Sequence, residues 1–398
     1  MKKQIKIPLI AIILVLIIII CVVIFLINGG ENDSEENDVV ENTAGNLVES
    51  GYTSNIGTEL EQSASISVVP TMRDTITTDS TWCGTFQLIW NDLKNEIAGQ
   101  DIVFENQTEE VNNLNLGEFN TDVISEDYYY KNYGLKTIEL KNEIEQGIYE
   151  KFGQTSDILD SFDWSEESLH GSGENDFRFF LYTMLYRKFE FGTQFTKLNN
   201  DTFGTNYNDV QYFGIDATSD SILDNQVTVL YYNSQDDFAV ILKTTSGDQV
   251  ILCKNPEGTN FNEIYTNMAN KANSYTGDRY FNDVDELKVP YINLDVTKEY
   301  EELAGKKFAV APQEYNNYTP GEGQIEQAIQ SIQLTLNETG GEIKSEAGMD
   351  VTTDAMMMPE ENQPRYFYVN DTFAIFLKEE SQNVPYFAAR IEDISKFQ

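Results

Sequence analysis

The chain contains one histidine, His170, and this limits the chemistry that it can perform. His170 lies in the polar segment 168–173, which predicts a loop. A zinc site needs a partner histidine at helical spacing, and a Ser-His-Asp triad would have to use this single residue. The sequence also has no Gly-x-Ser-x-Gly turn and no glycine-rich phosphate loop. We therefore predict that the chain is not an enzyme and uses no cofactor or metal.

The three cysteines do not form a disulfide framework. Cys21 lies within a long apolar run, which leaves two candidates for pairing. Cys83 follows Trp82, and Cys253 ends another apolar run. A disulfide between Cys83 and Cys253 is one alternative, but these apolar surroundings favour two buried free thiols.

The composition opposes binding to nucleic acid. The 398 residues carry a formal net charge of −40, which repels polyanions. No Asp-x-Asp-x-Asp-Gly loop is present, so the acidity indicates solubility outside the cell rather than calcium binding. The 23 Phe and 22 Tyr residues are sufficient to build a large core.

An apolar segment near the N-terminus predicts one transmembrane helix. Residues 7–27 are almost entirely apolar, and about 20 such residues cross a membrane. Lys2, Lys3 and Lys6 precede the segment, and the next cation is Arg73, so residues 1–6 are expected in the cytoplasm. A cleaved signal peptide is the alternative. The long apolar core and the absence of a small-x-small site favour an uncleaved anchor.

The rest of the chain is therefore expected outside the cytoplasm, as a single-pass protein of the cell membrane. Residues 28–64 are rich in Glu, Asp, Asn, Gly, Ser and Thr and predict a disordered acidic stalk. Residues 65–398 contain the regular apolar patterns of a folded extracytoplasmic domain.

Apolar spacing predicts several helices in that domain. Phe86, Ile89 and Trp90 recur at helical spacing within 83–97, where Asp79 or Ser80 can supply a cap. The other predicted helical segments are 135–152, 261–272 and a short turn at 325–329.

Beyond Tyr207 the pattern changes to short β-rich runs separated by turn residues. The predicted strands are 227–232, 238–243, 249–253, 287–295 and 332–336, followed by a terminal hairpin of 366–377 with 386–391. Pro290 cannot donate a backbone hydrogen bond, so it predicts that its strand lies at an edge or a bulge. The mixture of helices and strands predicts an α+β fold.

Five segments in the second half resemble the serpin family of serine protease inhibitors. They are Tyr182–Phe191, Lys288–Asp295 with the following Tyr300–Leu303, Ile332–Glu338 with Gly340, Phe367–Phe376 and Phe387–Ile391. Their order is similar to that of the family's central strand, its strand and helix segment, the strand before the reactive loop and the two closing strands. The resemblance identifies the chain as a divergent serpin-like protein of the bacterial type.

The resemblance has departures. Thr372 and Ala389 replace a proline and a glycine of the closing strands, and 101–106 stands where the family has Ser-Pro-x-Ser. The stretch before Tyr182 is also shorter than in the family. The front half is thus either a trimmed serpin or a different structure.

The resemblance implies a serpin-like domain of mixed β-sheets with surrounding helices, and a reactive loop. Serpins inhibit proteases by inserting the cleaved loop into the main sheet as a new strand. The implied hinge residues are Glu338, Gly340, Gly341, Ile343, Ser345 and Ala347. The implied bait segment contains Thr352, Asp354, Ala355, Met356, Met357, Met358 and Pro359. The implied partner is a secreted or cell-surface serine or cysteine protease.

The residues of this loop give evidence in both directions. Ile343, Lys344 and Glu346 break the alanine-rich hinge of the family and oppose inhibition. Alternate residues favour insertion, because one side of the segment is apolar or small (Gly341, Ile343, Ser345, Ala347, Met349 and Val351). An exposed loop or an ordinary surface strand remains the alternative, which corresponds to a non-inhibitory binding or sensor ectodomain.

Overall fold

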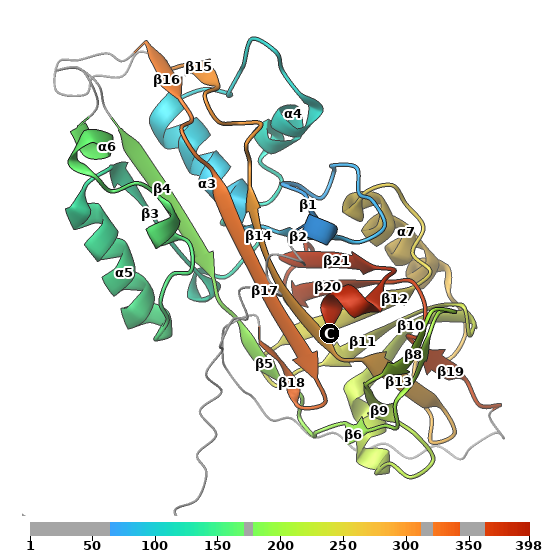
Figure 1. The fold of residues 1–398 in the computed structure, drawn as a ribbon. Helices are drawn as coiled ribbons and strands as arrows, with labels where there is room; N and C mark the ends of the chain where they lie inside the picture. The colour runs from blue at the N-terminus through green and yellow to red at the C-terminus, as the bar shows by residue number, and fades with distance from the viewer. Residues whose placement is uncertain (1–63, 171–177, 312–320, 343–362) are drawn as a thin grey trace, which may run out of the picture. The chain divides into compact units, whose positions relative to one another are not determined.

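The computed structural model describes residues 64–170, 178–311, 321–342 and 363–398 (Figure 1). The predicted cytoplasmic tail, transmembrane helix and stalk lie outside the described residues, apart from Ala64. No helix within the described ranges is long and apolar enough to cross a membrane. The assignment of residues 1–63 therefore stays a prediction.

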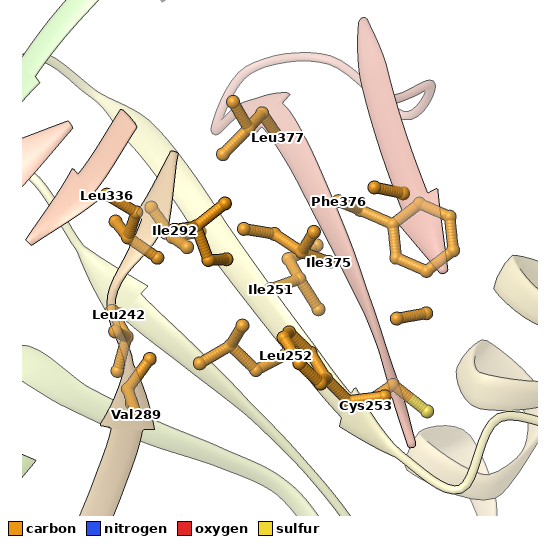
Figure 2. Close-up of a cluster of buried hydrophobic side chains, with 14 of the residues drawn as sticks. Leu242, Ile251, Leu252, Cys253, Val289, Ile292, Leu336, Ile375, Phe376 and Leu377 are labelled. Carbon is orange, nitrogen blue, oxygen red and sulfur yellow. The ribbon is translucent and has the colours of Figure 1, made fainter. Parts of the chain in front are cut away.

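The apolar runs after Tyr207 pair with the end of the chain in a seven-stranded sheet. In spatial order its strands are β1 (Ser67–Val68), β2 (Ser80–Cys83), β21 (Phe387–Ile391), β20 (Phe373–Glu379), β12 (Asp248–Lys254), β11 (Asp237–Lys243) and β10 (Val227–Ser234). All seven residues of β20 are buried, which requires cover on both faces. Figure 2 shows side chains of β11, β12 and β20 packed with residues from neighbouring strands.

The predicted terminal hairpin is confirmed for β20 and β21, which pair antiparallel. Phe373, Phe376 and Phe387 have 0% exposure, as expected for a central sheet. Helix α7 (Phe261–Ser274) packs on this sheet, where the ring of Tyr265 lies 5.2 Å from that of Phe376. The prediction that residue 366 begins the same strand is wrong, because Tyr366–Tyr368 forms β19 of another sheet.

The β19 sheet also corrects the interpretation of Pro290. The predicted strand 287–295 is two strands, β13 (Glu286–Pro290) and β14 (Ile292–Glu299), which belong to different sheets. β13 lies between β19 and β9 (Tyr212–Ile215), with β6 (Thr196–Lys197) beyond β9. Pro290 is thus at the end of an interior strand and not in an edge strand. Pro290 has no backbone N–H group, and it lies where the chain passes from the sheet of β13 to the sheet of β14.

The predicted helix at 83–97 is confirmed, but its start is different. Residues 80–83 form β2 because they pair with β21, with Trp82 opposite Ala388 and Cys83 opposite Phe387. Helix α3 (Thr85–Asp92) follows Gly84 and continues as a π-helical turn over Leu93–Ala98. Pairing with β21, which is distant in the sequence, therefore decides the structure of residues 80–83, although Cys83 has the apolar spacing of the helix.

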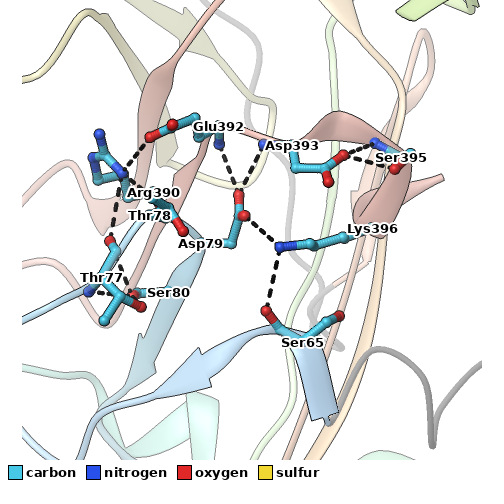
Figure 3. A network of polar contacts seen from close by, with 10 residues as sticks. All are labelled: Ser65, Thr77, Thr78, Asp79, Ser80, Arg390, Glu392, Asp393, Ser395 and Lys396. Carbon is cyan, nitrogen blue, oxygen red and sulfur yellow. Dashed lines mark hydrogen bonds and ion pairs between the residues drawn. The ribbon is translucent and has the colours of Figure 1, made fainter. Parts of the chain in front are cut away.

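Asp79 does not cap α3; it holds the end of the chain (Figure 3). Its Oδ1 atom accepts from the N–H groups of Glu392 and Asp393 at 2.8 and 2.9 Å. Its Oδ2 atom lies 2.7 Å from Lys396 Nζ. The contact fixes the final 3-10 turn (Ile394–Phe397) against the beginning of β2.

A second group of elements packs beside α3. β3 (Tyr129–Leu135) pairs antiparallel with β4 (Phe179–Leu185), and helix α5 (Ile138–Phe152) buries Leu140, Ile144 and Ile148 against Phe180 and Tyr182. α5 begins three residues later than predicted because Thr137 caps it and accepts from the N–H of Leu140. The other elements are α4 (Glu109–Leu116), α6 (Glu166–His170), β7 (Asp201–Phe203), β8 (Tyr207–Val210), β15 (Lys307–Ala309) and β16 (Glu322–Gln324).

Three smaller predictions have clear outcomes. Cys83 and Cys253 are buried free thiols, as expected. The predicted helical turn at 325–329 is wrong, because Ile329 begins strand β17 (Ile329–Asn337). The segment 300–303, which resembled a helix of the family, forms a turn.

Candidate functional site: a groove between two strand edges

The strand before the implied reactive loop lies in a four-stranded sheet of order β14, β17, β18 (Gly340–Glu342) and β5 (Lys188–Glu190). β17 alternates between buried and half-buried residues because one face covers the core. After a turn, β18 returns antiparallel to β17 and is also antiparallel to β5. The beginning of the loop segment therefore lies between two strands of the sheet.

Two glycines allow β18 to occupy this position. Gly340 has φ of +145°, and a Cβ atom there would lie 2.1 Å from the carbonyl oxygen of Phe189. A Cβ atom on Gly341 would lie 2.5 Å from the carbonyl oxygen of Thr335. Each contact is with backbone of a flanking strand, so any side chain at Gly340 or Gly341 would force the strands apart.

Glu338 anchors the turn before β18. Tyr291 Oη donates to Glu338 Oε2 at 2.6 Å, Gln194 Nε2 donates to Oε1 at 3.2 Å, and Lys197 Nζ lies 3.1 Å away. Burial opposes ionisation of this carboxyl group, but these donors outweigh it and lower the pKa of Glu338. The structure thus brings together the predicted hinge residues Glu338, Gly340 and Gly341.

Beyond β18 the two flanking strands separate and leave a groove. In the described ranges, β4 pairs only with β3, and residues 329–334 of β17 pair only with β14. The first residues of these two strands, Phe179–Tyr182 and Ile329, line a groove of about 1230 Å³. Figure 1 shows α3 in the space between β4 and β17, and its residues Phe86, Ile89 and Trp90 line the groove. An apolar floor between two open strand edges is suited to an extended peptide.

An ion pair between Arg178 and Glu326 lies in the groove. Arg178 precedes β4 by one residue, and Glu326 lies just before β17. Both side chains line the groove, with exposed fractions of 23% and 45%. The ion pair therefore lies within the groove, which is lined by the beginning of β4, by Ile329 at the start of β17 and by the hairpin of β15 and β16.

A buried polar cluster lies where β4 gives way to β5. The Arg187 Nε atom donates to Asp248 Oδ1 at 2.6 Å, and neither side chain is exposed. Tyr386 Oη also donates to Asp248 Oδ1 at 3.0 Å, and Ser246 Oγ donates to Oδ2 at 2.6 Å. The Arg187 guanidinium carbon lies 3.1 Å from the ring centre of Tyr128. This cluster was not predicted from the sequence, although an arginine within an apolar β-rich segment was an available signal for it.

Other predicted residues cannot be placed. Ile343, Ser345, Ala347 and the bait residues Thr352, Asp354, Ala355, Met356, Met357, Met358 and Pro359 lie outside the described residues. The backbone of His170 ends helix α6 and does not lie in a loop. No group of three or more His, Cys, Asp or Glu side chains in the described ranges is placed to hold a metal ion.

No family model and no curated protein matches the chain. Comparison with solved structures did give matches. The chain is similar to thyroxine-binding globulin in its complex with thyroxine, with 13% identity and a TM-score of 0.40. This match covers 64% of each of the two chains. Another match is Serpin48, a highly specific serpin of the insect Tenebrio molitor, with 13% identity and a TM-score of 0.34, covering 68% of this chain and 78% of that one.

Both of these structural neighbours are serpins. The serpin-like fold is seen in the described sheets themselves. β17, the strand before the implied loop, and β5, from the segment that resembles the family's central strand, flank β18. The chain spans less than two thirds of the length of thyroxine-binding globulin.

Proposed function

We propose that this protein is a membrane-anchored, extracytoplasmic serpin-like inhibitor of serine or cysteine endopeptidases that acts by inserting its reactive loop into the groove. The observation that supports this function most directly is the position of β18, which pairs with β17 on one side and β5 on the other. An inserted loop would continue from these three residues in the same direction, between the same two sides of the sheet.

The register of β18 defines where the following residues would lie. Gly341 is opposite Leu336 of β17 and Phe189 of β5. Continuing this register residue by residue would put Ile343 opposite Leu334 and Ser345 opposite Ile332. Leu334 and Ile332 are buried, and paired residues of neighbouring strands point to the same face. The small or apolar side of the loop segment would therefore face the core.

In this register the charged hinge residues would not oppose insertion. Lys344 and Glu346 would lie opposite Gln333 and Ser331, whose side chains are on the less buried face of β17. Their charges would thus stay solvated on insertion. Burial of Ile343, Met349 and Val351 would contribute on the order of 5 kcal/mol.

A non-inhibitory binding or sensor ectodomain is the second candidate. The Arg178–Glu326 ion pair favours it, because the contact crosses the end of the groove that a fully inserted loop would have to pass. In this alternative the groove stays partly open and β18 is a permanent short strand. The two functions differ in what happens when the loop is cut.

Thermal melting before and after loop cleavage tests the proposal. Cleavage between Thr352 and Pro359 should raise the melting temperature, because the freed segment adds a strand with new hydrogen bonds and buried apolar groups. Ile343→Glu should abolish the rise, since it would turn a carboxylate toward the buried face. An unchanged or lower melting temperature of the cut wild-type protein would leave the non-inhibitory function. A covalent complex with a target protease is the corresponding functional measurement.

The anchored topology is tested separately. A protease added to intact cells should release the chain from about Asn28 onward, because the cations before residue 7 favour a cytoplasmic N-terminus. Immunoblotting with an antibody to the C-terminal domain follows the release. Protection of that domain until the cells are lysed would contradict the proposed orientation.

A further inference from the structure

We propose that Glu379 is a proton-operated switch in the buried cluster of Arg187 and Asp248. A bound proton keeps the segment 125–128, which leads into β3, closed on the seven-stranded sheet, and loss of the proton lets the segment open. Glu379 is the last residue of β20, and its Oε1 atom accepts from the N–H of Ser125 at 2.7 Å. The switch acts within the folded core, so it does not depend on protease inhibition or on an inserted loop.

The cluster contains two buried carboxyl groups and one paired cation. Asp248 and Glu379 are 2% and 6% exposed. They lie directly opposite each other in the pairing of β12 with β20. Side chains of such a pair are on the same face of the sheet, with Cβ atoms about 5 Å apart. Because Arg187 is already paired with Asp248, two ionised carboxylates would leave one buried negative charge without a counter-charge.

The second cation near Glu379 is Lys378, and backbone carbonyl groups hold it. Its Nζ atom donates to the carbonyl oxygens of Glu379, Glu380 and Gln382 at 2.9, 3.4 and 2.7 Å. Its attraction is the weakest of the electrostatic effects on the Glu379 carboxyl group. The remaining titratable groups nearby are two tyrosines and three exposed acids, namely Tyr128, Tyr386, Glu126, Asp127 and Glu380.

The number of hydrogen-bond donors assigns the proton to Glu379. Asp248 accepts from Arg187, Tyr386 and Ser246, which stabilise its charged form. Among the described residues, the Glu379 carboxyl group accepts one hydrogen bond, from Ser125. Burial, and then repulsion by Asp248, raise the pKa of Glu379. Burial also raises the pKa of Asp248, so the two groups titrate as a pair, and the first proton goes to the member with fewer donors.

Opening of the segment 125–128 relieves the ionised cluster. The segment is held by the Ser125 contact and by Tyr128, whose ring lies on the Arg187 guanidinium group. When it lifts, water reaches Glu379, and the pKa of the carboxyl group returns to about 4.3. The closed form therefore binds the proton more tightly than the open form. Protection of the segment is greatest in acid and is lost as the pH rises through the pKa of the closed form.

Hydrogen exchange of the full chain tests the switch. It is measured by mass spectrometry at about pH 5 and about pH 8 and corrected for intrinsic rates. Peptides that cover residues 126–135 should be protected about threefold or more at the lower pH in the wild type. Glu379→Gln keeps an oxygen acceptor for Ser125 without the charge. It should show the protection of the acidic form at both pH values, and at pH 8 it should melt about 2 °C above the wild type.

Two further variants serve as comparisons. Glu380→Gln removes one exposed charge from the neighbouring residue, so it should respond to pH as the wild type does. Asp248→Asn should lower the melting temperature at pH 8, because Arg187 then lacks its buried counter-charge. If Asp248→Asn instead gains heat stability and Glu379→Gln loses it, the proton is on Asp248 and the assignment to Glu379 is wrong.

Three other results would overturn the switch. The first is equal protection of wild-type residues 126–135 at both pH values. The second is a pH response that persists in Glu379→Gln, because another group would then bind the proton. The third is a Glu379→Gln protein that does not fold at pH 5, since the neutral side chain should be accepted where the wild-type group is protonated.

Discussion

Arg187 and Asp248 form an ion pair in which both side chains are completely buried. Arg187 lies between β4 and β5, whereas Asp248 begins β12 of the seven-stranded sheet. The pair thus joins the side of the groove to the central core. Lys188, the next residue after Arg187, is opposite Glu342 of β18, so this junction lies next to the point where the proposed insertion would begin.

Removal of Arg187 should therefore destabilise the whole domain. Arg187→Met would leave the Asp248 carboxylate buried without its counter-charge, at an expected cost of about 3–5 kcal/mol in the free energy of unfolding. Urea denaturation measures this loss. Lys188→Met is the control, because its side chain is 42% exposed and should cost less than about 1 kcal/mol. A loss for Arg187→Met as small as that of the control would show that the pair is not a structural junction.

A second prediction concerns the pH dependence of stability. Burial first, and then the nearby Asp283, Asp285 and Asp220, raise the pKa of Asp224 to about 6. Because this is above the value of about 3.9 in an unfolded chain, ionisation of Asp224 costs stability as the pH rises from about 4 to about 7. Asp224→Asn should therefore stabilise the protein at pH 7 by about 1 kcal/mol, after allowance for solvent screening.

The gain from Asp224→Asn should shrink as the pH falls toward 4, because the carboxyl group is then protonated in the folded protein and about half protonated in the unfolded chain. Thermal melts at several pH values follow this change. Glu105→Gln removes one negative charge from an exposed position and is the control for net charge. A gain that is equal at pH 7 and pH 4, or equal in the control, would contradict the prediction.

A third prediction concerns the central sheet. Phe373→Ala should cost about 3–5 kcal/mol, because Phe373 has 0% exposure and its ring packs 6.1 Å from that of Phe203. Chemical denaturation measures the difference. Tyr149→Ala, at a residue with 67% exposure on α5, should change stability by less than about 1 kcal/mol. A cost below about 1 kcal/mol for Phe373→Ala would make the hairpin peripheral.

The sequence predicted those parts of the fold in which local pattern and tertiary environment agree. Strands β11 and β12 are continuous apolar runs, and α7 has a regular apolar face; all three were found close to their predicted positions. The prediction was wrong where long-range pairing decides. Cys83 has helical spacing with the apolar residues of α3, but it belongs to β2, whose partners in β21 lie more than 300 residues later.

The candidate site also has one feature that follows from local sequence pattern and one that depends on residues distant in the chain. The alternating pattern after Gly340 predicted a strand with one apolar face; its first residues form β18, and those from Ile343 onward lie outside the described residues. The groove itself could not be predicted, because it is formed by edges of β4 and β17 that are about 150 residues apart in the chain. Arg178 and Glu326 are ordinary surface charges in the sequence, and only their meeting across the groove makes them informative.

The last prediction tests whether β18 is the start of insertion. Gly340→Ala would put a Cβ atom against the backbone of Phe189 in a conformation that non-glycine residues rarely adopt. The uncut variant should lose about 1–3 kcal/mol of stability. Cutting the loop between Thr352 and Pro359 should then fail to raise the melting temperature, because the first residues of the new strand no longer fit between β17 and β5. Gly321→Ala is the control, since a Cβ atom there has no neighbour within 4 Å, and it should keep both the stability and the rise. If cut Gly340→Ala gains as much heat stability as the cut wild type, the added stability does not come from a strand that begins at β18.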